Sequence, residues 1–143
     1  MKLLVTAADQ KDRSIPEGVE LIKVGEDLDQ KLNSITDNSC TEMILEEVFE
    51  NSKYEDFVPL FNMLINKIRL GGQMLVVGID LLTLSDLYNS HLIDEEIMNR
   101  AIFSKKSLHN CKSLIHIAHQ RNLNVASLEK SGFNYKLILT RLS

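Results

Sequence analysis

The chain has 143 residues, of which 44% are hydrophobic and 25% are charged. This length is sufficient for one domain with a hydrophobic core, and the composition is that of a globular protein rather than a disordered or collagen-like chain. The formal net charge is −4, with Lys and Arg scattered along the chain, so the sequence indicates no positive surface for phosphate groups. We predict a single domain, residues 1–143, with no nucleic-acid partner.

Membrane and metal-binding classes are also disfavoured. The apolar runs are far shorter than the roughly 20 residues that a membrane-spanning helix needs, and the N-terminus lacks the pattern of a signal peptide. Cys40 and Cys111 are far apart in sequence and form no CxxC pair, which predicts two buried thiols rather than a disulfide or a zinc site. We expect a cytoplasmic protein with no membrane contact and no metal.

The N-terminal part of the chain predicts two strands and a short helix. Residues 2–8 contain a continuous apolar run, which is typical of a strand buried on both faces. Residues 19–24 predict a second strand, which ends at Gly25. Leu28 and Leu32 are four residues apart and predict the apolar face of a short helix.

The middle of the chain predicts a third strand and a long helix. Residues 43–45 are the short apolar strand. Ser52 and Glu55 have the spacing of a capping box, so the helix is expected to begin there, and Gly71 supplies a left-handed stop. Its apolar residues at helical spacing are Phe57, Leu60, Phe61, Leu64, Ile65 and Ile68.

The C-terminal half predicts one central strand, three helices and a hairpin. The strand covers residues 73–80, the helices residues 83–89, 94–103 and 107–121, and the hairpin residues 125–128 and 135–139. Strands that alternate with helices before a closing hairpin predict an α/β fold. We expect a doubly wound, mostly parallel sheet with helices on both faces and a C-terminal antiparallel hairpin.

Several segments carry a resemblance to a known family. They are Asp37-Asn38-Ser39, Glu47-Val48-Phe49-Glu50-Asn51, the long helix, Leu70-Gly71-Gly72, the strand at residues 74–80, and Ser131-Gly132-Phe133 before the last strand. In this order they resemble class I S-adenosylmethionine-dependent methyltransferases, particularly small bacterial and phage members, over nearly the whole chain. The resemblance implies a Rossmann-like methyltransferase fold, S-adenosylmethionine as the cofactor and methyl transfer as the activity.

The chain departs from this family after the first strand. Where the family has a glycine-rich turn that lets the backbone approach the cofactor, this chain has Thr6-Ala7-Ala8-Asp9. Asp9 matches the acidic residue that ends the family's turn, so the resemblance implies that these four residues line the cofactor site. The two alanines add Cβ atoms, and a non-glycine residue costs roughly 1–2 kcal/mol in a left-handed conformation. We therefore expect cofactor binding to be weakened or lost.

The resemblance implies further cofactor-binding residues at two places. Glu26 or Asp27, just past the second strand, matches the acidic residue that binds the ribose hydroxyls; the alternative is an N-cap for the short helix. Asp37 and Asn38 match the adenine-side loop; the alternative is a loop in which these side chains bond their own backbone.

Acidic residues also follow two other strands, at the edge where open α/β sheets bind ligands. Glu46, Glu47 and Glu50 follow the third strand. The first two are candidates for the cofactor site and all three for a catalytic base, whereas the alternative is a solvated acidic turn. Asp80 resembles the family's aspartate after the central strand, or is a helix N-cap. No catalytic residue is assigned.

The predicted helix at residues 107–121 carries His109, His116 and His119 on one stripe. A spacing of three residues permits shared ligation, but no third ligand follows in the pattern, so no metal site is predicted.

Two functions stay open on the sequence. The first is a small S-adenosylmethionine-dependent methyltransferase, with weakened or lost cofactor binding, whose small-molecule or protein substrate the sequence does not identify. The second is a non-catalytic domain of the same fold that works as a binding or assembly module. Leu81, Leu82, Leu84 and Leu87 favour pairing with another copy as a homo-oligomer.

Overall fold

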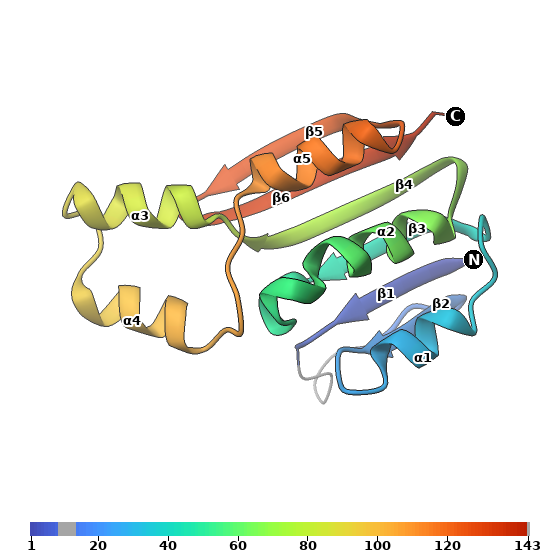
Figure 1. The fold of residues 1–143 in the computed structure, drawn as a ribbon, viewed down its shortest axis with the longest axis horizontal. Helices are drawn as coiled ribbons and strands as arrows, with labels where there is room; N and C mark the ends of the chain where they lie inside the picture. Colours follow the sequence, from blue (N-terminus) through green and yellow to red (C-terminus); the bar gives the residue numbers. More distant parts are fainter. Residues whose placement is uncertain (9–13, 143) are drawn as a thin grey trace.

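A computed structural model describes residues 1–8 and 14–142 and contains one six-stranded sheet (Figure 1). The strand order is β2-β1-β3-β4-β6-β5. The strands are β1 (Lys2–Thr6), β2 (Val19–Lys23), β3 (Cys40–Glu46), β4 (Ile68–Ile79), β5 (Leu123–Ser131) and β6 (Asn134–Arg141). The first four are parallel, and β6 is antiparallel to both β4 and β5. The α/β class, the mostly parallel sheet and the C-terminal hairpin are therefore confirmed.

The helices are α1 (Leu28–Asn33), α2 (Phe57–Lys67), α3 (Leu81–Asn89), α4 (Glu95–Phe103) and α5 (Cys111–Gln120). Two short 3-10 turns, η1 (Phe49–Asn51) and η2 (Tyr54–Asp56), lie between β3 and α2. Figure 1 shows α3 and α4 beyond the end of the sheet, where Leu84 and Ala101 form a small second core with Ile79. No helix in the described part of the chain has the length and apolarity needed to cross a membrane.

The three helices α1, α2 and α5 cover the same face of the sheet. Their buried residues share one core cluster with Leu3 and Val5 of β1, whereas Leu4, which points to the other face, is outside that cluster. Right-handed crossovers explain this arrangement, because β2 to β3, β3 to β4 and β4 to β5 all step in one direction along the sheet. Among the connections between parallel strands, only the step from β1 to β2 runs the other way, and the described residues of that connection form no helix. The described chain therefore places no helix over the second face, and the expected helices on both faces are not found among the described residues.

The boundaries of α2 differ from the sequence prediction. The expected capping box is wrong, because Ser52 Oγ donates to the Val48 carbonyl at 2.9 Å and closes η1, while α2 begins at Phe57. The helix ends at Lys67 rather than at the glycines. Gly71 has a φ of 77° inside β4, where the pairing with β3 shifts from Cys40 opposite Ile68 to Glu42 opposite Gln73. Gly71 therefore allows the irregular backbone within β4 and does not end the helix.

The start of α5 also differs from the prediction, since residues 107–110 are not helical and the helix begins at Cys111. Asp80 forms a parallel bridge with His109 and accepts a hydrogen bond from the Cys111 backbone at 2.8 Å. This contact with the end of β4 holds the segment extended until the helix begins. Cys40 and Cys111 are both buried free thiols, as predicted.

Candidate functional site

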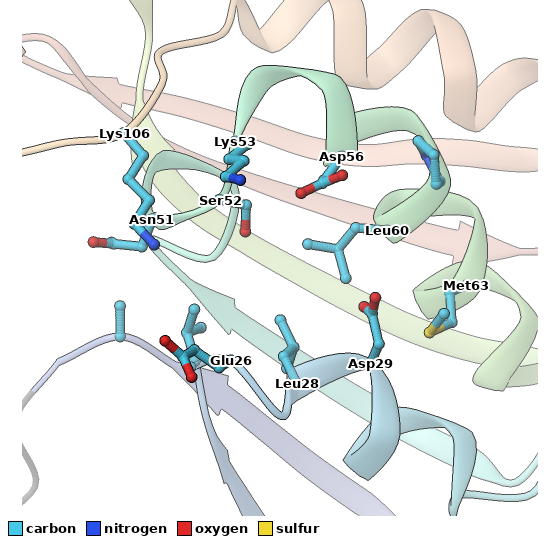
Figure 2. Close-up of a pocket in the computed structure, with 14 residues that line it drawn as sticks. Glu26, Leu28, Asp29, Asn51, Ser52, Lys53, Asp56, Leu60, Met63 and Lys106 are labelled. Atoms are coloured by element: carbon cyan, nitrogen blue, oxygen red, sulfur yellow. The ribbon is translucent and has the colours of Figure 1, made fainter.

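A pocket of about 550 Å³ opens at the carboxyl ends of β1 and β2, between α1 and α2. Open α/β sheets bind ligands at this edge. Figure 2 shows Glu26, Leu28 and Asp29 on one side of the pocket and Asp56, Leu60 and Met63 on the other. The remaining lining residues are Ala7, Val24, Gly25, Asn51, Ser52, Lys53, Pro59 and Lys106.

The lining combines an apolar centre with charges of both signs. Leu28 and Leu60 supply the buried apolar surface, and Met63 is half-buried beside them. Three carboxylates (Glu26, Asp29 and Asp56) and two ammonium groups (Lys53 and Lys106) surround this surface. Such a pocket suits a ligand that has an apolar body and carries both an anionic and a cationic group.

The turn after β1 is closed by its own hydrogen bonds. The buried Thr6 hydroxyl donates to Glu46 Oε2 at 2.9 Å and accepts from the Ala8 backbone at 3.0 Å. The Ala7 backbone donates to the Glu46 carbonyl at 3.3 Å. Neither alanine is among the described non-glycine residues with positive φ, so the expected left-handed strain does not occur. Asp9 lies outside the described residues.

Of the acidic residues after β2, the structure brings Glu26 to the pocket. Asp27 occupies the N-cap position of α1, but its side chain forms no cap hydrogen bond and instead pairs with Lys31 at 3.3 Å. Asp27 therefore forms a surface ion pair on α1. Glu26 remains the candidate acceptor for the hydroxyl group of a ligand.

The three glutamates at and after the end of β3 have different environments, and none of them lines the pocket. Glu46 accepts the Thr6 hydroxyl, and Glu47, whose φ is 52°, pairs with Lys105 at 2.9 Å. Glu50 is 1% exposed, and its Oε1 accepts from the Ile79 backbone at 3.1 Å. Burial raises the pKa of Glu50 to about 7. Because Glu50 is buried, the alternative interpretation, a solvated acidic turn, is wrong for this residue.

The structure does not bring Asp37 and Asn38 to this pocket. They precede β3 and so lie at the amino-terminal edge of the sheet, opposite the carboxyl edge. Asp37 pairs with the buried Lys67 at 2.7 Å, and Asn38 Oδ1 accepts from Arg141 at 2.8 Å. Asn38 has a φ of 58°, a conformation that asparagine tolerates in loops. Both residues therefore hold the loop before β3.

Asp80 acts as the N-cap of α3, since its Oδ2 accepts from the Thr83 backbone at 3.2 Å. Burial alone would raise the pKa of Asp80, but hydrogen bonds from Thr83 and Cys111, together with the charge of Lys130, outweigh it and lower the pKa. The N-cap alternative is confirmed for Asp80, and both oxygens of its carboxylate have partners.

Sequence reasoning missed the residues that the segment around η1 and the return from α4 bring to the pocket. Asn51 and Lys53 follow β3 closely, so the rule that ligands bind at the carboxyl edge could have found them. Lys106 had no such signal, because its segment is held at the site by contacts between residues far apart in sequence, among them the hydrogen bond from the Lys106 backbone to the Glu50 carbonyl at 2.8 Å. His109 is off the helix that carries His116, and no three potential metal ligands gather within the described residues.

Comparisons with known proteins find similarity in structure alone. No protein-family model matches the chain, and no curated protein matches it in sequence. A solved S-adenosylmethionine-dependent methyltransferase from Archaeoglobus fulgidus aligns over 96% of this chain and 85% of its own, with a TM-score of 0.61 and 12% identity.

Two further methyltransferases show the same likeness. The protein from Methanosarcina mazei aligns over 99% of this chain and 92% of its own, with a TM-score of 0.61 and 8% identity. The protein from Anabaena variabilis aligns over 99% of this chain and 77% of its own, with a TM-score of 0.62 and 6% identity. The chain therefore has the fold of the class I S-adenosylmethionine-dependent methyltransferases, as the resemblance in its sequence predicts.

Proposed function

We propose that the chain binds a ligand of the S-adenosylmethionine class in the pocket between α1 and α2, and binds it weakly. The observation that carries this proposal is the position of Glu26, which lines a pocket of about 550 Å³ at the carboxyl end of β2. This volume is within the range of about 300–1,000 Å³ that is usual for small-molecule sites. The proposal is also supported by the structural similarity of the chain to S-adenosylmethionine-dependent methyltransferases.

The residues of the pocket fit the chemical groups of such a ligand. The carboxylate of Glu26 can accept hydrogen bonds from the two ribose hydroxyls, and Leu28 and Leu60 offer an apolar surface to the adenine ring. Lys53 and Lys106 are cations for a carboxylate, whereas Asp29 and Asp56 are anions for an ammonium group. When bound, S-adenosylmethionine supplies a reactive methyl group, and the chain's part is to hold and orient the ligand.

Weak binding follows from the turn after β1. The N–H groups of Ala7 and Ala8 already donate to the Glu46 carbonyl and the Thr6 hydroxyl, so they are not free for a ligand carboxylate. The Ala7 side chain also lines the pocket, whereas that of Ala8 does not. A ligand at this turn therefore gains fewer hydrogen bonds than an open glycine-rich turn would offer.

Calorimetric titration with S-adenosylmethionine and with its demethylated product tests the proposal. We expect saturable binding that Glu26→Gln weakens about tenfold, the change that losing a charge-assisted hydrogen bond produces. Ala7→Gly should tighten binding, and Ala8→Gly, outside the pocket, is its matched control. Absence of heat and of a thermal shift at ligand concentrations of about 10 mM would exclude the proposed site.

A second candidate function, assembly with another copy, is favoured by the uncovered face of the sheet. Five apolar residues occupy one row across five adjacent strands on this face: Leu21, Leu4, Ile44, Leu75 and Ile138. Leu21 is 40% exposed, Ile44, Leu75 and Ile138 are half-buried, and Leu4 is buried at 2% exposed, so the outer strands present most of the accessible apolar surface of the row. Lys2 and Glu42, paired at 3.2 Å, flank the row, so charges of both signs are available for a self-complementary contact.

Sedimentation equilibrium tests the assembly function separately from ligand binding. We expect a dimer whose dissociation constant rises at least about tenfold in Ile138→Lys, because a lysine in the apolar row must be desolvated on association. Leu70→Lys is the control, since Leu70 is 58% exposed in the irregular part of β4, outside the row. A monomer at every concentration, or equal effects of both variants, would count against this function.

A further inference from the structure

The charges that line the pocket between α1 and α2 are divided between its two walls. Glu26 and Asp29 lie on the wall that β2 and α1 form, and no lysine or arginine among the described residues lines this α1 wall (Figure 2). Lys53, Lys106 and Asp56 lie on the opposite wall. The charged groups of the α1 wall are therefore all acidic, whereas the opposite wall carries both signs.

The charged side chains of the pocket have no counter-ion of their own. None of the five forms an ion pair within the described part of the chain. Asp27 differs from its neighbours Glu26 and Asp29, because it pairs with Lys31 at 3.3 Å and does not line the pocket. Since the pocket has one more carboxylate than it has ammonium groups, a ligand with one net positive charge balances it.

The ligand class proposed above exists in two forms that differ by one charge. S-adenosylmethionine carries a sulfonium, an ammonium and a carboxylate at neutral pH, so it has one net positive charge. Its demethylated product is a thioether and has no net charge. Both forms contain the ammonium and the carboxylate, so only the sulfonium distinguishes them by charge.

The position of Glu26 brings the sulfonium close to the α1 wall. Glu26 is the proposed acceptor for the ribose hydroxyls, and the sulfur is bonded to the C5′ atom of that same ribose. A ligand that is held by its ribose therefore keeps its sulfur near this carboxylate. Asp29, in the first turn of α1, adds a second carboxylate to the same wall. Opposite charges at such short range attract even in water, and more strongly near a protein surface.

We propose that the α1 wall makes this pocket select the positively charged sulfonium over the neutral thioether, so that the chain retains S-adenosylmethionine and releases the demethylated product. This inference rests on the ligand class proposed above and adds the property by which the pocket separates its two forms. We expect a preference of about fivefold, the size of one attraction between opposite charges across water.

Calorimetric titration of the full chain with three ligands tests the preference. They are S-adenosylmethionine, its demethylated product, and sinefungin, in which a carbon that bears an ammonium group replaces the sulfonium. At an ionic strength of about 10 mM, where screening is weak, both cationic ligands should bind about fivefold more tightly than the neutral product. In about 1 M salt the affinities should converge, because screening then acts over only a few ångströms.

Matched variants test whether the α1 wall is the cause. Asp29→Asn should weaken S-adenosylmethionine more than the product, so that their affinity ratio falls at least about twofold. Asp27→Asn is the control, because it removes a carboxylate two residues away that is paired with Lys31 outside the pocket. Lys106→Gln removes a positive charge instead, so the ratio should not fall. All three side chains are exposed, so the thermal unfolding midpoints should stay near that of the parent.

The possible outcomes separate this inference from the proposed function. A product that binds as tightly as S-adenosylmethionine would overturn the inference and leave the pocket as a site for both forms. Equal effects of Asp27→Asn and Asp29→Asn on the affinity ratio would also overturn it. No heat with any of the three ligands at about 10 mM would instead remove the proposed function, and the inference with it.

Discussion

The buried carboxylate of Glu50 accepts a hydrogen bond from the backbone N–H of Ile79, with 3.1 Å between Oε1 and N. The backbone carbonyl of Glu50 accepts in turn from Lys106 at 2.8 Å. One residue thus connects η1, the end of β4 and the segment that returns from α4. Because Lys106 lines the pocket between α1 and α2, this connection also fixes one wall of the candidate site.

The raised pKa of Glu50 predicts that stability falls as the pH rises. Its pKa is about 7 in the folded chain against an ordinary value of 4.5, so the folded state binds more protons between these values. The stabilisation is fully present below pH 4.5, decreases through the interval and is lost above about pH 7. Its size is on the order of 3 kcal/mol, and urea unfolding at a series of pH values measures it.

Glu50→Gln is the control, because the amide keeps an acceptor for Ile79 but does not titrate. His109 has a lowered pKa and so acts in the opposite direction, with stability lost as the pH falls below 6.5. The informative quantity is therefore the difference in unfolding free energy between the parent and Glu50→Gln. A difference that stays constant from pH 5 to pH 8, to within roughly 0.5 kcal/mol, would contradict the prediction.

Gly78→Ala is expected to destabilise the chain by roughly 1–3 kcal/mol, the usual cost of overpacking a core. A Cβ at Gly78 would lie 2.1 Å from Glu50 Oε1 and 3.2 Å from the Tyr135 hydroxyl, so the carboxylate would have to leave Ile79. Gly25→Ala is the matched control, since its nearest contact would be Asp27 Oδ1 at 3.5 Å. Thermal unfolding compares the two variants. Equal unfolding midpoints would show that the Glu50 side chain can move away from the new Cβ without a loss of stability.

Sequence patterns predicted the strands better than the ends of the helices. The apolar run at residues 73–80 predicted the central position of β4, which lies between β3 and β6 in the sheet. Ser52 and Glu55 had the spacing of a capping box, but Ser52 closes η1 instead. Local spacing cannot decide between these roles, because the same serine hydroxyl can accept from a backbone N–H in a capping box or donate to a backbone carbonyl, as Ser52 does to Val48.

The candidate site was predictable only where a residue directly follows its strand. Glu26 follows β2 and lines the pocket, as expected if open α/β sheets bind ligands at the carboxyl ends of their strands. Asp37 was misplaced because the resemblance gave its order in the chain but not the edge of the sheet at which it lies. Lys106 depends on a hydrogen bond to a residue 56 positions earlier, which no local pattern contains.

Lys67→Met is expected to cost roughly 1–3 kcal/mol, because one buried and one partly buried hydrogen bond are lost. The Lys67 ammonium donates to the Ile35 carbonyl at 2.8 Å and to Asp37 at 2.7 Å, and the residue is 6% exposed. Lys31→Met is the control, because the Lys31–Asp27 pair is exposed and such pairs contribute only about 0.3–0.5 kcal/mol. Urea unfolding measures both variants. Similar losses of unfolding free energy would show that the burial of Lys67 does not strengthen its contribution to stability.

Asp37→Asn is expected to leave the affinity for S-adenosylmethionine unchanged, whereas Glu26→Gln lowers it. Asp37 lies at the amino-terminal edge of the sheet and pairs with Lys67, while Glu26 lines the pocket at the other edge. Calorimetric titration of the two variants separates these positions. A loss of affinity in Asp37→Asn equal to that in Glu26→Gln would mean that the ligand does not bind in the pocket described.

Asp80→Asn is expected to destabilise the chain by roughly 1–3 kcal/mol, although asparagine is as good an N-cap as aspartate. Asp80 accepts from the Cys111 backbone on Oδ1 and from the Thr83 backbone on Oδ2, and it is 2% exposed. An amide has only one oxygen, so one of these N–H groups would face an NH₂ group and lose its partner. Thermal unfolding at neutral pH measures the loss.

Asp94→Asn is the matched control, because Asp94 caps α4 through a single exposed bond to the Ile97 backbone at 2.9 Å, and an asparagine oxygen can replace it. Acid unfolding gives a second readout for Asp80. Its pKa is lowered from 3.8, so its stabilisation is present above that value and is lost as the pH falls through the folded pKa. The parent should therefore lose its advantage over Asp80→Asn below about pH 4, whereas a constant advantage would show that the carboxylate charge adds nothing to the junction of β4 and α5.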